Sequence, residues 1–121
     1  MQTAAILVTG LVALLHVWFL VLEMFLWTKP YGRRVFGLAP EKAELTRSLA
    51  ANQGLYNGFL AAGLVWGLMA GPDGHTIKVF FLSCVIIAGI FGAATASRKI
   101  LWGQAVPGAL ALALVCAAHR S

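Results

Sequence analysis

Long runs without charged residues constrain the fold of this 121-residue chain more than any other feature. Four such runs cover most of the sequence, at residues 1–22, 48–72, 79–97 and 100–119. Each is close to the roughly 20 residues that an α-helix needs to cross the ~30 Å hydrocarbon core of a bilayer. Only 11% of the residues are charged, whereas about a quarter are charged in a typical soluble domain. The sequence therefore predicts an all-α integral membrane protein.

We expect a four-helix transmembrane bundle that forms a single domain over residues 1–121. The predicted spans are about 3–27, 48–70, 77–97 and 103–118. The second helix is expected to begin at Pro40, a favoured first-turn residue, and to continue without a break to about residue 70. The basic segment 31–38 is expected to be a loop, because Lys29 and Pro30 should end the first helix.

The basic residues are distributed unevenly between the two sides of this bundle. Seven of the nine lie in the two connections that share a side, namely Lys29, Arg33, Arg34, Lys42, Arg47, Arg98 and Lys99. The positive-inside rule places that side in the cytoplasm and both termini outside it. The first run is not expected to be a cleaved signal peptide, because no basic residue precedes it. Nucleic-acid binding is not expected, because the only basic surface is in these short connections.

Glu23 is the most unusual residue of the first predicted span. An acidic side chain in a bilayer is costly, by several kcal/mol, and is by default a candidate for a functional site. His16 lies seven residues earlier, which places the two within about 20° on one helix face. They are about 10 Å apart along the helix axis, so a direct hydrogen bond between them is not expected. We predict Glu23 and His16 as the candidate catalytic residues.

Several polar side chains are predicted at the same depth as Glu23, in the cytoplasmic half of the bundle. The candidate ligand-binding residues are Asn52, Gln53, Tyr56, Asn57, Gln104 and Arg98. Because lipid offers no hydrogen-bond partners, amide groups at this depth need polar neighbours. We therefore expect the amides and the carboxyl group to converge on one region.

Three functions are compatible with that region. The first is a site that binds or converts a small lipophilic molecule, with Glu23 as proton acceptor or hydrogen-bond anchor. The second is a proton-coupled transporter of small molecules that uses Glu23. The third is a structural or accessory membrane subunit in which Glu23 is an interhelical staple, held by an amide of the second span.

No motif identifies a cofactor. A haem or metal site is not expected, because His16 is the one histidine well inside the predicted membrane region and no two-histidine helix motif is present. His75 and His119 are expected to be solvated residues near the outer surface. Cys84 and Cys116 are expected to be buried thiols rather than a disulfide.

Small residues recur every four positions on the third predicted helix, at Ala88, Gly92 and Ala96. Such spacing lets two helices approach closely in lipid. We expect a packing seam here, which could face another helix of the chain or join two copies in a homo-oligomer.

Three stretches carry a resemblance to a known family: HVWFLVLEMFLW at residues 16–27, NQGLYNGFLAAGL at 52–64 and GQAVPGALAL at 103–112. The chain resembles an uncharacterised family of small bacterial membrane proteins, known as domain of unknown function 1304. The resemblance covers essentially the whole chain. It implies a multi-pass protein of the bacterial inner membrane and names no reaction.

Overall fold

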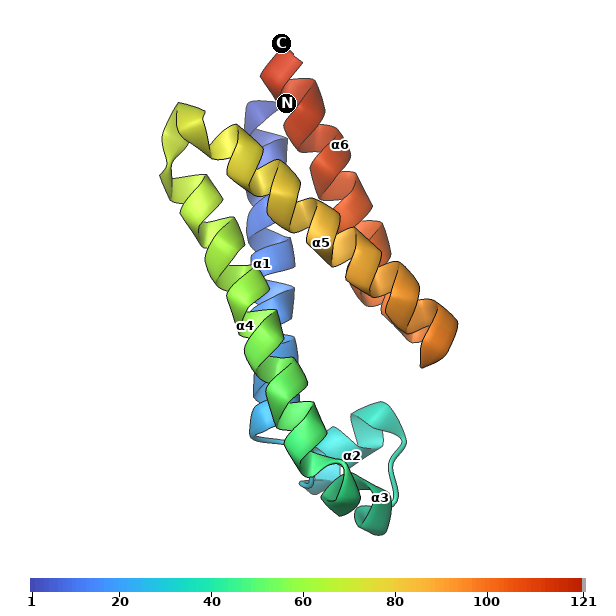
Figure 1. Cartoon of the computed structure of the whole chain (residues 1–121). Coiled ribbons are helices and arrows are strands. Elements are labelled where there is room, and N and C mark those ends of the chain that lie inside the picture. Colours follow the sequence, from blue (N-terminus) through green and yellow to red (C-terminus); the bar gives the residue numbers. More distant parts are fainter. Residues whose placement is uncertain (121) are drawn as a thin grey trace. The chain divides into compact units, whose positions relative to one another are not determined.

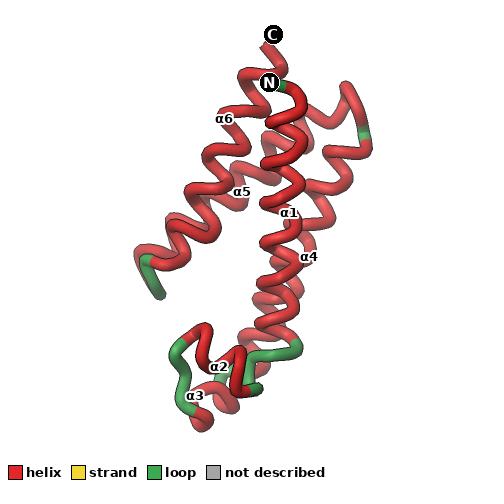
Figure 2. The backbone as a smooth tube through the Cα atoms, turned by 180° about the vertical axis from the view of Figure 1, so that it is seen from behind, coloured by secondary structure: helices red, strands yellow, loops and turns green. Residues whose placement is uncertain are grey.

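The computed structural model describes residues 1–120, with Arg120 described by its backbone alone, and these residues form helices joined by short turns (Figure 2). The α-helices are α1 Gln2–Met24, α2 Pro30–Phe36, α3 Pro40–Leu45, α4 Arg47–Met69, α5 Gly74–Thr95 and α6 Val106–Arg120. A 3-10 turn at Gly71–Asp73 precedes α5, and a π-helical turn at Leu101–Ala105 precedes α6. The predicted all-α class is confirmed.

Three helical stretches are long and apolar enough to cross a membrane, at Gln2–Met24, Gly71–Thr95 and Leu101–His119. They indicate a membrane protein. The helix α4 has 23 residues, as α1 does, but it is not among the three, because the amides of Asn52, Gln53 and Asn57 make it less apolar. The predicted fourth span and the orientation of the chain stay predictions.

The segment between α1 and α3 differs from the sequence prediction. The first helix ends at Met24 rather than Trp27, and the predicted loop at residues 31–38 is wrong because α2 occupies most of it. Pro30 is the first residue of α2, where its missing N–H costs no hydrogen bond. Gly37 ends α2 with a φ of 64°, a left-handed conformation that favours glycine. Residues read as helix breakers therefore start and end a short helix.

The predicted continuous helix from Pro40 to about residue 70 is also wrong, because the chain breaks at Thr46 (φ −103°, ψ 6°). The Thr46 hydroxyl donates to the Lys42 carbonyl oxygen at 2.7 Å and accepts a hydrogen bond from Trp27 Nε1 at 3.0 Å. Hydroxyl bonds to a carbonyl one turn earlier compete with regular helix geometry and bend helices. The break separates α3 from α4.

The chain divides into two compact units. We call residues 1–15 together with the chain from Leu60 onward the terminal unit, and residues 16–59 the central unit. In the terminal unit, α5 and α6 run side by side (Figure 1). Its core is apolar and consists of Ala5, Val12, Ala13, Leu64, Leu82, Val85, Ala111 and Val115.

The predicted small-residue seam of α5 is used within the terminal unit. A Cβ atom added to Gly89 would lie 2.6 Å from the backbone nitrogen of Ala105, and one added to Gly92 would lie 3.1 Å from Ile100. Ala88 and Ala96 are exposed. One side of the seam therefore packs against the residues that lead into α6, and the predicted homo-oligomer contact stays a prediction.

The central unit contains the second half of α1, the helices α2 and α3, and the first half of α4. In it, α2 and α3 lie beside the first turns of α4 (Figures 1 and 2). Glycines let α4 approach α1 closely. A Cβ atom at Gly54 would lie 2.7 Å from Met24 Cγ, and one at Gly58 would lie 2.7 Å from Leu20 Cδ1. This contact positions the candidate site.

Candidate functional site

Glu23 and Asn57 meet in the central unit. Glu23 is the penultimate residue of α1 and is half-buried, whereas Asn57 on α4 is buried, with 7% of its surface exposed. The Asn57 Nδ2 atom donates a hydrogen bond of 2.5 Å to Glu23 Oε1. A carboxyl group and an amide from two different helices therefore form one polar contact.

The local sequence of α4 explains why Asn57 is the amide that reaches Glu23. Gly54 and Gly58 are four residues apart, a spacing that places them on one face of a helix and lets a second helix approach closely. Asn57 precedes Gly58 directly, so its short side chain emerges beside this contact. The Cβ position of Gly54 is 3.2 Å from Glu23 Cβ, which puts the carboxyl group at the same level. Gly54 and Gly58 are not among the residues predicted from the sequence for this site, although their spacing is a readable signal.

The other polar residues at the start of α4 face away from this contact. Asn52, Gln53 and Tyr56 are exposed. Asn52 Nδ2 donates to the Tyr56 hydroxyl oxygen at 3.0 Å, one turn along the same helix. The Tyr56 ring lies 6.2 Å from that of Phe59. Four side chains of α4 were expected to converge on Glu23. Among these four, Asn57 is the one that contacts it, and the ligand contacts of Asn52, Gln53 and Tyr56 stay predictions.

His16 is fully buried, and its ring packs edge to face against Phe19 with 5.2 Å between the ring centroids. It lies two turns before Glu23 on α1. A histidine in such a position is shielded from bulk solvent. Its predicted catalytic role stays a prediction.

Arg98 and Gln104, the last two predicted ligand contacts, belong to the terminal unit. Arg98 is exposed in the turn after α5, and Gln104 is half-buried in the π-helical turn. Their predicted part in the site of Glu23 stays a prediction.

Histidines and thiols elsewhere form no metal-binding group of three or more His, Cys, Asp or Glu side chains within residues 1–120. Cys84 and Cys116 are free thiols. In the terminal unit, the rings of His75 and His119 stack nearly parallel, with 3.6 Å between centroids and 14° between planes. His75 is half-buried and His119 is exposed, and the prediction that both are solvated residues near the outer surface stays a prediction. The contact joins α5 to the end of α6, a tertiary pairing with no local sequence signal.

Comparison with known proteins gives two matches. The model of a family described as "Protein of unknown function (DUF1304)" matches residues 10–116. The chain is also 30% identical over 114 residues to the uncharacterized protein YpaA of Lactococcus lactis subsp. lactis (strain IL1403), a match that covers 93% of this chain and 96% of that protein. No solved structure matches significantly. The resemblance inferred from the three sequence stretches is confirmed.

Proposed function

We propose that this chain, which belongs to the DUF1304 family, binds or converts a small lipophilic molecule at a polar site centred on Glu23. The observation that carries the proposal is the hydrogen bond from buried Asn57 to half-buried Glu23. In this proposal Asn57 holds the carboxyl group in place. Glu23 then serves as hydrogen-bond anchor or proton acceptor for the ligand.

The hydrogen-bonding capacity of the carboxyl group supports a ligand. An ionised carboxylate has about four acceptor positions on its two oxygens. Within residues 1–120, Asn57 is the donor that bonds to Glu23. A half-buried carboxyl group with acceptor capacity to spare can receive a hydroxyl or amide donor from a bound molecule.

The class of ligand follows from the proposed membrane placement. We propose four spans in a bacterial plasma membrane, with both termini outside and the basic connections in the cytoplasm. The length of α4, about 35 Å for 23 residues, is enough to cross a ~30 Å core. Glu23 would then lie in the cytoplasmic leaflet. A ligand reaching it from the lipid has to be apolar over most of its surface, and exposed apolar side chains of the central unit, such as Phe25 and Phe59, suit such a ligand.

A second candidate function is favoured by the same hydrogen bond. If its contribution is only structural, Glu23 is an interhelical staple in an accessory membrane subunit. Interhelical hydrogen bonds in a membrane protein contribute about 0.6 kcal/mol on average. A staple therefore needs the hydrogen bond and not the charge or the proton. A proton-coupled transporter, the third possibility, needs the proton.

The variant Glu23→Gln separates these functions, because glutamine keeps a hydrogen-bond acceptor and loses the ionisable group. The full chain and the variant are purified from bacterial membranes, and small molecules in their organic extracts are compared by mass spectrometry. We expect a lipophilic compound to co-purify with the parent and to be lost from Glu23→Gln. The control is Glu41→Gln, which removes an exposed acid of the same unit and should retain the compound.

Identical extracts from the parent and from folded Glu23→Gln would overturn the ligand site and favour the staple. Reconstituted vesicles test the transporter alternative. A proton flux that is present with the parent and absent with Glu23→Gln would support transport over binding alone.

The homo-oligomer is proposed on the exposed side of the α5 seam. Ala88 and Ala96 are exposed and two turns apart, so a second copy could pack there closely. Light scattering of the detergent-solubilised chain gives its mass. We expect a mass above that of one copy, reduced by the paired substitution Ala88→Leu and Ala96→Leu, and a monomeric parent would rule the contact out.

A further inference from the structure

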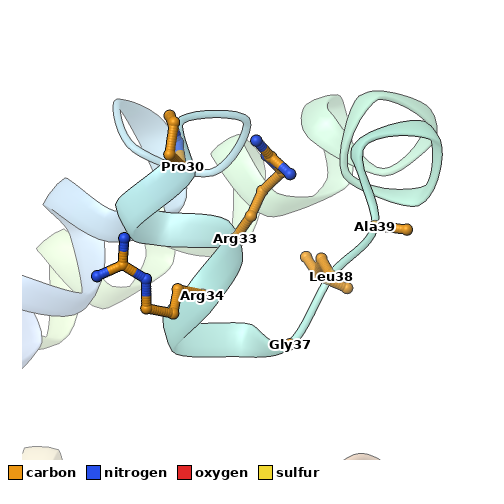
Figure 3. A pocket seen from close by; sticks show the side chains of 6 residues that line it. All are labelled: Pro30, Arg33, Arg34, Gly37, Leu38 and Ala39. Carbon is orange, nitrogen blue, oxygen red and sulfur yellow. The ribbon is translucent and has the colours of Figure 1, made fainter.

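A basic surface lies beside α2, and none of its lining residues is among those proposed to bind the lipophilic molecule. It is shallow and widely open, has a volume of about 610 Å³, and is lined by Pro30, Arg33, Arg34, Gly37, Leu38 and Ala39 (Figure 3). All of these residues belong to the central unit. The surface combines two guanidinium groups with a small apolar wall.

The two arginines are not neutralised by acidic side chains. Among residues 1–120, the ion pair that forms joins Arg47 to Glu44, at 3.6 Å. Arg33 Nε donates to the Thr28 carbonyl oxygen at 3.3 Å, which fixes the direction of its guanidinium group. An arginine has five N–H donors, so the terminal nitrogens of Arg33 keep their donors for an anion. Figure 3 shows the two arginines leaving α2 in different directions, so the surface offers more than one contact.

Apolar side chains accompany these charges on the same short helix. Tyr31, Val35 and Phe36 are exposed, with 48%, 39% and 40% of their surfaces accessible. Tyr31 and Val35 are four residues apart and so share a face. Aromatic and basic residues together are typical of the zone where lipid headgroups meet hydrocarbon. These three side chains do not line the basic surface, but they suit α2 to that zone of a membrane.

The helix α2 is held firmly enough to present these groups. The Cβ position of Gly32 would be only 1.8 Å from the Leu26 carbonyl oxygen, so α2 is seated directly on the preceding turn. The Phe36 ring lies 4.7 Å from that of Trp27, and the Tyr31 ring lies 6.3 Å from that of Trp18. Packing on both sides of the arginines reduces the conformational entropy lost on binding.

We propose that this surface binds the headgroup of an anionic phospholipid, with Arg33 and Arg34 contacting it from different directions. Guanidinium groups bind phosphate through short, charge-assisted hydrogen bonds, and anionic lipids attract basic segments at the membrane surface. The lipid's acyl chains would lie against the apolar residues that line the same surface, Pro30, Leu38 and Ala39. This inference is independent of Glu23 and adds a lipid site to the proposed function.

The experiment titrates the purified full chain in non-ionic detergent with phosphatidylglycerol or with phosphatidylcholine and counts bound lipids by native mass spectrometry. We expect the parent to prefer phosphatidylglycerol. The paired substitution Arg33→Gln and Arg34→Gln should weaken that binding about tenfold or more, the loss expected for charge-assisted hydrogen bonds. The matched control, Lys42→Gln with Arg47→Gln, removes two basic residues of the same unit that do not line the surface. Its affinity should stay within about twofold of the parent.

Three results would overturn the proposal: no preference for phosphatidylglycerol, equal losses in the two charge-removing pairs, or complete displacement of the lipid by millimolar inorganic phosphate. The last result would identify a soluble phosphate as the ligand. If the glutamine pair does not fold, Arg34→Gln alone serves as the test, because that side chain is exposed. It should still weaken phosphatidylglycerol binding several-fold, and unchanged binding would count against the site.

Discussion

The two units of the chain both bring long helices together at glycines, but what lies opposite each glycine differs. In the terminal unit, the Cβ position of Gly89 meets the backbone of Ala105 at 2.6 Å. In the central unit, the Cβ position of Gly58 meets only the end of the Leu20 side chain, at 2.7 Å. A backbone cannot move aside, whereas a leucine can change rotamer. The contact at Gly89 is therefore rigid, whereas the contact at Gly58 can yield.

The strongest test of this contrast adds one methyl group to each unit. Gly89→Ala should lower the free energy of unfolding by about 1 to 3 kcal/mol, the usual cost of overpacking, because α5 has to shift from Ala105. Gly58→Ala should cost about 1 kcal/mol or less. Denaturation in mixed detergent–SDS micelles, followed by tryptophan fluorescence, measures both.

The control for these substitutions is Gly10→Ala. Gly10 lies inside α1 in the terminal unit, and a Cβ atom there would meet nothing within 4 Å. Stability should stay the same or rise by about 0.5 to 1 kcal/mol, because alanine favours helix more than glycine does. If Gly58→Ala cost as much as Gly89→Ala, the contrast between these two contacts would be wrong.

The long helices could be predicted from the sequence, because a charge-free apolar run of the right length has few alternatives in a membrane. The structure of the segment between Pro30 and Thr46 could not be predicted in this way. Pro30 and Gly37 are breakers within a helix and also the ordinary first and last residues of one, and the sequence gives no local sign of which applies. The Thr46 hydroxyl at the break accepts a hydrogen bond from the Trp27 indole, nineteen positions earlier in the chain, and no local pattern predicts that contact.

The candidate site was predictable only in part, for a similar reason. Glu23 stands out because it is an acid in an apolar run. Three amides of α4, those of Asn52, Gln53 and Asn57, were candidates for its hydrogen-bond partner. Their angular positions on the helix do not show which of them faces Glu23. The choice follows from where Gly54 and Gly58 let α1 approach, which leaves Asn57 facing Glu23 and Gln53 exposed.

A threonine-to-valine substitution should have opposite effects in the two units. Thr46 in the central unit accepts from Trp27 Nε1, so Thr46→Val should lower stability by about 1 kcal/mol and leave the indole N–H without its acceptor. Thr9 in the terminal unit is fully buried, and its hydroxyl has no hydrogen-bond partner within residues 1–120. Thr9→Val should raise stability by about 1 kcal/mol, because it removes an unsatisfied polar group at nearly constant volume.

The same denaturation assay checks both signs, and the tryptophan emission of Thr46→Val reports directly on the indole. Destabilisation by Thr9→Val would mean that the Thr9 hydroxyl has a hydrogen-bond partner, such as a water molecule. The interior of the terminal unit would then be more polar than its apolar core indicates. If stability and emission do not change with Thr46→Val, the hydrogen bonds of the Thr46 hydroxyl do not explain the break between α3 and α4.

The smallest expected effect is the coupling between Glu23 and Asn57, and its size bears on what the pair is for. A double-mutant cycle with Glu23→Ala and Asn57→Ala should give about 0.6 kcal/mol, and at most about 1.7. The cycle of Asn52→Ala and Tyr56→Phe, an exposed pair bonded at 3.0 Å, is the control and should give less. A coupling no larger than the control would rule out the staple. Glu23 would then contribute little to holding α1 and α4 together, and Asn57 would not be the residue that holds its carboxyl group in place.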